Sequence, residues 1–215
     1  MKPILFNTEM VKALLDGRKT VTRRVVKPKC KHNFVSSGID GEPAECRMID
    51  IETQEIVRHV YPPYQPGDIL YVRETYGTYS TFNGHSYVYK GDYIDSENLD
   101  KAKKLIKRWI PSIHMPKEAA RIFLRVTDVR VERLQEIDVD GSIAEGAWGG
   151  GQPNIPFSFL YKEHPKASCN AVASFAHIWD STIKPSDLPL YGWEASPWVW
   201  VIEFERISKE DAYNA

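Results

Sequence analysis

A basic stretch over residues 17–24 holds the residue types best suited to chemistry in this chain. It reads Gly-Arg-Lys-Thr-Val-Thr-Arg-Arg, and its four cations in eight positions are Arg18, Lys19, Arg23 and Arg24. Guanidinium and ammonium groups at this density hold anionic ligands such as a nucleotide or an RNA backbone. The same stretch is also compatible with a solvated basic turn.

The residue types of this stretch also suit amide hydrolysis. That reaction needs a nucleophile, a group that takes and returns a proton, and stabilisation of the oxyanion. Thr22 can supply the hydroxyl nucleophile or position a water. Lys19 can act as the base if burial or the neighbouring cations lower its pKa. Without such an environment, both residues would be ordinary surface groups after a helix end.

A helix is predicted before the basic stretch and a strand within it. Asn7 or Thr8 is a typical N-cap, and Gly17 favours the left-handed conformation that often ends a helix. Residues 20–26 are rich in β-branched side chains, which favour a strand. Side chains alternate along a strand, so Thr22 would face the opposite side from its two neighbours.

Composition limits the class of protein. The 215 residues are 42% hydrophobic, 12% aromatic and 27% charged, which indicates a folded globular chain. We expect one domain over residues 1–215, with insertions at 27–66 and 149–167. The formal net charge is −1, so any bound nucleic acid must meet a local basic patch. No apolar run approaches ~20 residues and the N-terminus has no secretory signal, which predicts no membrane partner.

The cysteines predict neither disulfides nor a standard zinc site. Cys30, Cys46 and Cys169 form no disulfide pattern, which favours a reducing, cytoplasmic location. His32 and His59 lie near the first two, but the spacings match no pair-plus-pair zinc pattern. We therefore expect thiols, no metal, no cofactor and no disulfide-linked partner.

The remaining pattern predicts many strands and few helices. Predicted strands cover 3–6, 69–75, 121–134 and 198–207, with a hairpin turn at Asn83-Gly84. Predicted helices cover 138–147, with Asp138 as cap, and 168–183, with Ser168 as cap. Bent strands with short helices favour a mixed α+β fold built on a small β-barrel.

The order of these motifs resembles the ASCH domain, a family with a PUA-like β-barrel similar to RNA-binding modules. The resemblance spans nearly the whole chain and includes residues 17–24, Pro-Gly-Asp-x-Leu-x-Val-Arg-Glu at 66–74, Ala-Glu-Gly at 144–146 and Val-x-Glu-Phe at 201–204. It is closest to ASCH proteins encoded by phages and prophages, which carry the same segments at 111–116 and 198–205. The resemblance implies a PUA-like barrel flanked by short helices, in a bacterial cytoplasm.

Some small bacterial ASCH proteins are amidohydrolases that release the acyl group of N4-acetylcytidine, and others bind or cleave RNA. Their amidohydrolase pattern is a Lys, a Thr three residues later and a distant Glu. The resemblance implies Lys19, Thr22 and Glu145 as catalytic residues, with Glu136 as the alternative glutamate. The predicted function is hydrolysis of an acylated cytidine-type nucleoside. The alternatives are a non-catalytic RNA-binding module and a ribonuclease.

Further residues are predicted to contact the nucleoside or RNA. They are Arg18, Arg23, Arg24, Arg73, Glu74 and Trp148. Tyr76 and Trp193 are further candidates for stacking on a base. With six Trp and eleven Tyr in the chain, core packing is the alternative role of each aromatic residue. His114 is predicted to be structural.

Overall fold

The computed structural model describes residues 1–26, 33–37, 45–49, 56–82, 84–92, 100, 103–147 and 170–215. The chain forms two compact units. Unit 1 comprises residues 1–17, 67–125 and 205–215, and unit 2 comprises residues 18–66 and 126–204. Two of the four boundaries fall inside the two longest strands, β9 (Phe123–Arg133) and β10 (Trp198–Ile207). The prediction of a single domain stays a prediction.

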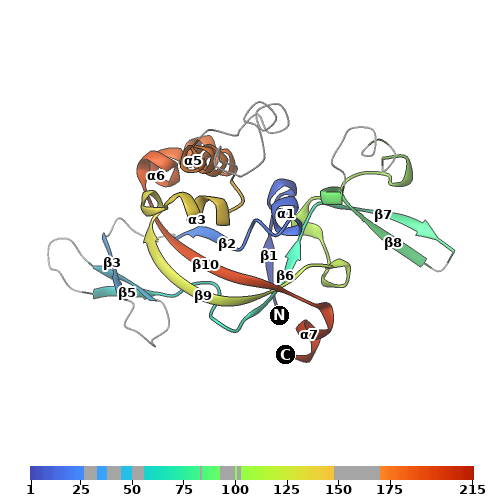
Figure 1. Ribbon diagram of the computed structural model, residues 1–215, viewed down its shortest axis with the longest axis horizontal. Helices are drawn as coiled ribbons and strands as arrows, with labels where there is room; N and C mark the ends of the chain where they lie inside the picture. The colour runs from blue at the N-terminus through green and yellow to red at the C-terminus, as the bar shows by residue number, and fades with distance from the viewer. Residues whose placement is uncertain are drawn as a thin grey trace. The chain divides into compact units, whose positions relative to one another are not determined.

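The main sheet has five strands in the order β1-β6-β9-β10-β2 (Figure 1). Strand β1 (Lys2–Leu5) runs parallel to β6 (Ile69–Arg73), whereas β6 with β9 and β10 with β2 (Val21–Val25) pair antiparallel. The mixed α and β class is therefore confirmed. Closure into a barrel requires the two edge strands to pair. Among the described strands β1 pairs with β6 and β2 with β10, so this sheet is open.

Two smaller sheets accompany the main one. Strands β3 (Asn33–Ser37), β4 (Glu45–Ile49) and β5 (Ile56–Val60) form an antiparallel sheet within the predicted insertion at 27–66. The other residues of 27–55, and all of 149–167, lie outside the described residues.

The predicted hairpin is confirmed in unit 1. Strand β7 (Tyr76–Thr81) pairs antiparallel with β8 (Gly84–Tyr89). Gly84 has a φ of +123°, a backbone conformation that favours glycine. Asn83 itself lies outside the described residues.

Local capping chemistry sets the ends of the helices in unit 2. Helix α3 (Val139–Ala144) begins where the Asp138 side chain accepts a hydrogen bond from Gly141 N at 2.7 Å, as predicted. Helix α5 (Ala171–Thr182) begins at Asn170, whose side chain accepts from Val172 N at 2.9 Å. The prediction of Ser168 as the cap was wrong, because Asn170 caps α5. Ser168 itself lies outside the described residues. The short helix α6 (Leu188–Tyr191) follows.

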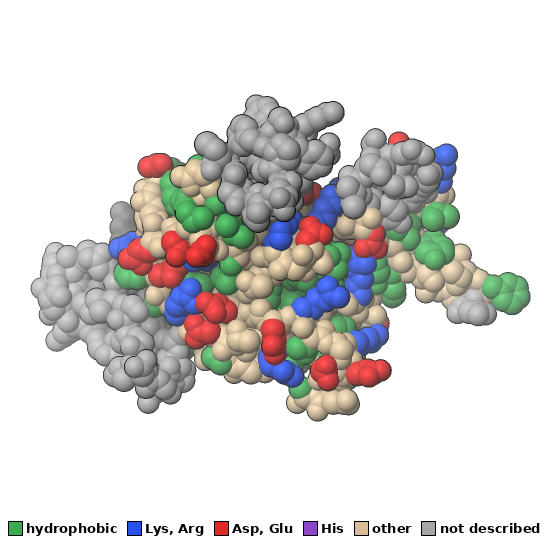
Figure 2. Space-filling model, viewed as in Figure 1, with side chains coloured by type: hydrophobic (Ala, Val, Ile, Leu, Met, Phe, Trp, Pro, Cys, Tyr) green, Lys and Arg blue, Asp and Glu red, His purple; other side chains and the backbone are tan. Residues whose placement is uncertain are grey.

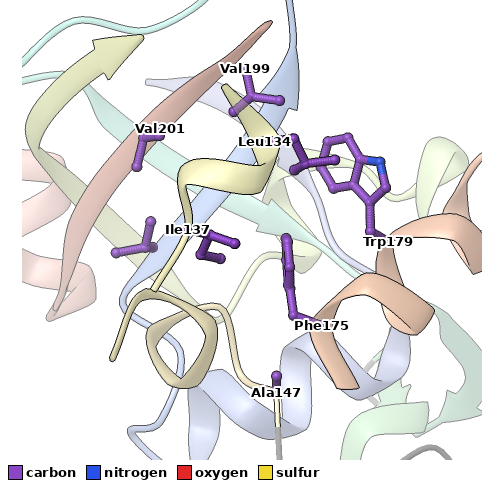
Figure 3. Packing of buried hydrophobic residues seen from close by; sticks show 8 residues of the cluster. Leu134, Ile137, Ala147, Phe175, Trp179, Val199 and Val201 are labelled. Carbon is purple, nitrogen blue, oxygen red and sulfur yellow. The ribbon is translucent and has the colours of Figure 1, made fainter. Parts of the chain in front are cut away.

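The core of unit 2 is formed by α5, strands β10 and β2, and the segment that follows β9 (Figure 3). Phe175 and Trp179 project from α5 toward Val199 and Val201 of β10. The Phe175 ring lies 6.0 Å from the Trp179 ring and meets Trp193 edge-on at 6.2 Å. Four consecutive residues of β10, 199–202, are buried, which confirms that this strand is covered on both faces.

Unit 1 has its own core. Helix α1 (Thr8–Leu15) contributes Val11 and Leu14 to the buried residues, and helix α7 (Lys209–Asn214) contributes Ala212 to a cluster around Phe123 and Met115. In the part of the chain described, no helix combines the length and apolar character needed to cross a membrane.

Loss of the Phe175 ring should destabilise the chain. Phe175→Ala removes a ring that is 4% exposed, and such truncations cost about 3–5 kcal/mol of unfolding free energy. Phe82→Ala is the matched control, because Phe82 is fully exposed; its effect should stay within about 0.5 kcal/mol. Urea denaturation followed by circular dichroism measures both, and equal losses would contradict this core.

Candidate functional site

The turn between α1 and β2 places Lys19 inside unit 2. Helix α1 ends as predicted, and Gly17 has a φ of +76°, which suits the glycine at this turn. Two backbone hydrogen bonds then fix Thr20: its N–H donates to Ala144 O at 2.9 Å, and its carbonyl oxygen accepts from Phe204 N at 3.0 Å. Lys19 is 2% exposed as a result.

The end of helix α3 places Glu145 against this turn. Glu145 is the C-cap residue of α3, and Gly146 follows with a φ of +93°. The Arg18 guanidinium donates to Gly146 O at 2.9 Å. Two glycine-containing turns, 120 or more residues apart in sequence, are therefore joined by side-chain and backbone hydrogen bonds.

Lys19 and Glu145 form a buried ion pair. Lys19 Nζ donates to Glu145 Oε2 at 2.6 Å, to Glu145 O at 3.0 Å and to Val21 O at 2.7 Å. All three ammonium protons thus have an oxygen acceptor. Burial lowers the pKa of Lys19 because the charged form loses its hydration, and the Glu145 carboxylate opposes this shift. Arg24 and Arg23 lower the Lys19 pKa further by charge repulsion.

Thr22 is buried beside this pair and on the predicted face of β2. Its side chain has no exposed surface, and Oγ1 accepts a hydrogen bond from Arg24 Nη1 at 3.0 Å. Thr22 and Arg24 therefore share a face, as the alternation predicted. The partner of the Thr22 hydroxyl is Arg24 and not Lys19. Burial also lowers the pKa of Arg24, whereas Glu145 and Tyr64 act in the opposite direction.

Arg23 lies on the opposite face of β2. It is 4% exposed, contacts the core through the Phe175 ring, and donates to Glu132 Oε1 at 2.6 Å and to Glu145 Oε1 at 3.5 Å. Three cations, Lys19, Arg23 and Arg24, thus surround the single carboxylate of Glu145. The arrangement can orient that carboxylate, shift a proton between it and Lys19, and stabilise negative charge near Thr22.

A polar hollow of about 430 Å³ opens on the Arg23 side of this group. It is lined by side chains of both charges together with apolar and uncharged residues: Thr20, Val21, Arg23, Arg130, Glu132, Glu136, Ile137, Asp138, Asp140, Gly141, Ala144 and Glu203. The three predicted catalytic residues do not belong to this lining. Thr22 in particular is fully buried and does not line this hollow.

Two other predicted binding residues lie in unit 1, where each has structural partners. Arg73 donates to Met115 O at 2.8 Å and to Ile113 O. Glu74 is 1% exposed and accepts two hydrogen bonds from Arg121, at 2.9 and 3.1 Å. These contacts link neighbouring segments of unit 1, and the predicted role of both residues in binding stays a prediction.

The remaining candidates have local roles or fall outside the described residues. The Glu136 carboxylate accepts from Arg133 N at 2.9 Å, so it caps a short 3₁₀ turn. Tyr76 donates to His114 O at 3.2 Å within unit 1, and Trp193 packs against the core of unit 2. Trp148 lies outside the described residues.

The sequence predicts that the three cysteines are free thiols and bind no metal, and the structure describes few of the residues concerned. Cys30 and Cys169 lie outside the described residues, and Cys46 lies in β4 without a described side chain. Across the ranges that the structure does describe, no group of three metal-ligating side chains occurs. The state of the cysteines stays a prediction.

Sequence reasoning missed Glu132, Arg130 and Glu203. Arg130 Nε lies 3.4 Å from Glu132 Oε2, and Arg130 Nη1 contacts Glu203 Oε1. The available signal was a charged residue within an otherwise apolar strand, since Glu203 interrupts a buried run and Arg130 and Glu132 alternate with valines. That signal does not identify which residue each of these charged side chains pairs with. Figure 2 shows acidic and basic side chains interspersed over the described part of the face it displays.

Fold and site together define a mixed α/β protein whose unit 2 contains a buried lysine–glutamate pair with a threonine hydroxyl and two arginines beside it. Comparisons with protein families, curated proteins and solved structures found no match to this chain.

Glu74 should make stability fall as pH rises. Burial raises the pKa of Glu74 above its ordinary value of 4.5, although Arg121 opposes the shift. The unfolded chain therefore releases this proton at lower pH than the folded chain does, and folding becomes less favourable between the two pKa values. The unfolding free energy of the wild-type chain relative to Glu74→Gln should therefore fall as the pH rises above the ordinary pKa of a glutamate.

Urea unfolding of both proteins across this pH range measures the difference. Glu118→Gln is the control, because Glu118 is exposed. A wild-type advantage over Glu74→Gln that stayed constant or grew with pH would contradict the assignment.

Proposed function

We propose that this chain is an amidohydrolase that removes the acyl group from an acylated cytidine-type nucleoside such as N4-acetylcytidine. The observation that carries the proposal is the 2.6 Å contact between buried Lys19 and Glu145. The buried Thr22 directly follows Val21, whose carbonyl oxygen also accepts a hydrogen bond from Lys19. Lys19, Thr22 and Glu145 are the three residues to which the ASCH resemblance assigns catalysis. We accordingly propose membership of the ASCH family and a PUA-like fold. The five-stranded mixed sheet with short helices is compatible with that fold.

Thr22 is the nucleophile in the proposed reaction. Because its side chain has no exposed surface, the reaction requires a local opening of the chain that admits the substrate. The Thr22 oxygen accepts a hydrogen bond from Arg24, which leaves the hydroxyl proton for a base and places a positive charge beside the attacking oxygen. Lys19 first passes a proton to Glu145 across their short contact. The neutral amine then accepts the Thr22 proton as Oγ1 attacks the acyl carbon.

Collapse of the resulting oxyanion breaks the bond between the acyl carbon and N4 of cytosine, and this nitrogen takes the proton from Glu145. Water then repeats the cycle: Lys19 takes its proton, the hydroxide attacks the acyl ester, and Thr22 Oγ1 leaves with a proton from Glu145. Both side chains return to their starting charges. Burial favours the required transfer between Lys19 and Glu145, because a low dielectric disfavours separate charges.

A non-catalytic RNA-binding module is the second candidate, and one specific observation favours it. All three protons of Lys19 already have oxygen acceptors, two of them main-chain carbonyls. Such a set holds the lysine as a cation and gives it a structural role. Arg18 and Arg24 would then contribute positive charge for phosphate contacts.

Hydrolysis is tested by chromatography of cytidine released from N4-acetylcytidine. Lys19→Ala and Thr22→Ala should each lower the rate about 10²–10⁴-fold, since each removes a group that moves a proton or forms a bond. Lys19→Arg should not restore turnover because a guanidinium cannot act as a base, whereas Thr22→Ser should retain part of it. Lys107→Ala, an exposed lysine, is the control.

The two candidates give different results with RNA. For the binding module, affinity for single-stranded RNA should fall steeply with salt, and Lys19→Arg should preserve it. Absence of turnover on acylated nucleosides, combined with such binding, would reject the hydrolase and support the module.

A further inference from the structure

The carboxylate of Glu145 is shared unequally between two cations. Its Oε2 atom lies 2.6 Å from Lys19 Nζ, whereas its Oε1 atom lies 3.5 Å from Arg23 Nη1. Both cations are buried. Arginine–carboxylate pairs frequently form a closer contact with two hydrogen bonds. The longer distance to Arg23 indicates that another group binds its guanidinium.

Glu132 holds Arg23 away from Glu145. Two nitrogens of the guanidinium, Nη2 and Nε, donate to Glu132 Oε1 at 2.6 and 3.1 Å. Gly141 leaves space for this placement, because a Cβ there would lie 3.3 Å from Arg23 Nη2. The Phe175 ring, 5.9 Å from the guanidinium carbon, bounds it on another side.

Glu132 in turn pairs with Arg130, a more exposed residue. The Oε2 atom of Glu132 lies 3.4 Å from Arg130 Nε, and Arg130 also pairs with Glu203 and Asp128. Charges of alternating sign thus extend from a half-exposed arginine to the buried lysine. Glu132 lines the hollow and its side chain is 19% exposed, so it can be changed with little effect on the core.

We propose that Arg23 and Glu132 are a pair of positioning residues: Glu132 retains the Arg23 guanidinium so that Glu145 keeps one carboxylate oxygen for Lys19. In the proposed hydrolase this pair would set the proton affinity of the reacting amine, and in that respect the inference rests on the proposed function. The pairing itself is independent of catalysis and can be measured without a substrate.

The two members of the pair should act in opposite directions. In Glu132→Gln the guanidinium loses its anionic partner and moves toward Glu145, so Lys19 loses part of its carboxylate contact and its proton affinity falls. In Arg23→Gln the Glu145 carboxylate interacts with Lys19 without competition from Arg23, and the positive charge of Arg23 is removed. The proton affinity of Lys19 therefore rises. The charged groups facing Lys19 among the described residues are Glu145 on the α3 side, and Arg23 and Arg24 on β2.

The experiment is a pH titration of the full chain with lysine labelled at the Cε carbon, followed by NMR. The Lys19 signal is identified by its absence in Lys19→Arg. We expect the Lys19 midpoint to move down by roughly one pH unit in Glu132→Gln and up by a similar amount in Arg23→Gln. The double substitution should return it close to the wild-type value. Arg125→Gln and Glu205→Gln, from an exposed pair in unit 1, should leave it unchanged.

Shifts in the same direction, or an unchanged midpoint in Glu132→Gln, would overturn the inference. If Arg23→Gln does not fold, Glu132→Gln decides alone. Where the chain turns over N4-acetylcytidine, the acid limb of the kcat/KM profile should move with the midpoint. Opposite shifts without any turnover would support the positioning pair and reject the hydrolase, so the two failures are distinguishable.

Discussion

The contact between Lys19 and Glu145 is the constraint on which the arrangement of the site depends. Two opposite charges are removed from water, and their mutual attraction balances that loss only with close geometry and with partners for the remaining protons. Both conditions hold here, because the pair is 2.6 Å apart and two main-chain carbonyls accept the other ammonium protons. The contact joins the turn before β2 to the end of α3, and so determines where the β2 side chains lie.

The surrounding charges follow from this contact. A single carboxylate faces Lys19, Arg23 and Arg24, so positive charge exceeds negative charge around it. Glu132 pairs with one of these cations, Arg23, on one face of β2. On the opposite face, Arg24 donates a hydrogen bond to the Thr22 hydroxyl, which places positive charge beside the hydroxyl that is the proposed nucleophile.

Local chemistry explains what could be predicted from the sequence. The cap of α1, the turn at Gly17 and the Asp138 cap each involve residues within a few positions of one another. The turn and the Asp138 cap were predicted, and Asn7 was one of the two candidates, with Thr8, for the cap of α1. Alternation along β2 placed Thr22 and Arg24 on one face. The choice of Glu145 as the predicted catalytic glutamate came from the family resemblance, and the structure puts this residue, not Glu136, against Lys19.

Long-range pairing explains what could not be predicted. Arg23 and Glu132 are 109 positions apart, and no spacing rule links a charge on one strand to its partner on another. The same holds for Glu74 and Arg121, whose bidentate contact gives a predicted binding residue a structural partner. Whether a sheet closes depends on pairing between its edge strands, which the strand pattern alone does not determine.

A double-substitution cycle on the unfolding free energy tests the central contact most directly. Glu145→Leu leaves Lys19 buried beside two arginines and should cost roughly 3–5 kcal/mol, whereas Lys19→Met should cost less, because Arg23 can still pair with Glu145. The double variant should recover most of the larger loss, since neither charge is then left without its partner. Losses that simply add in the double variant would contradict the account, because they would mean that the two side chains do not depend on each other.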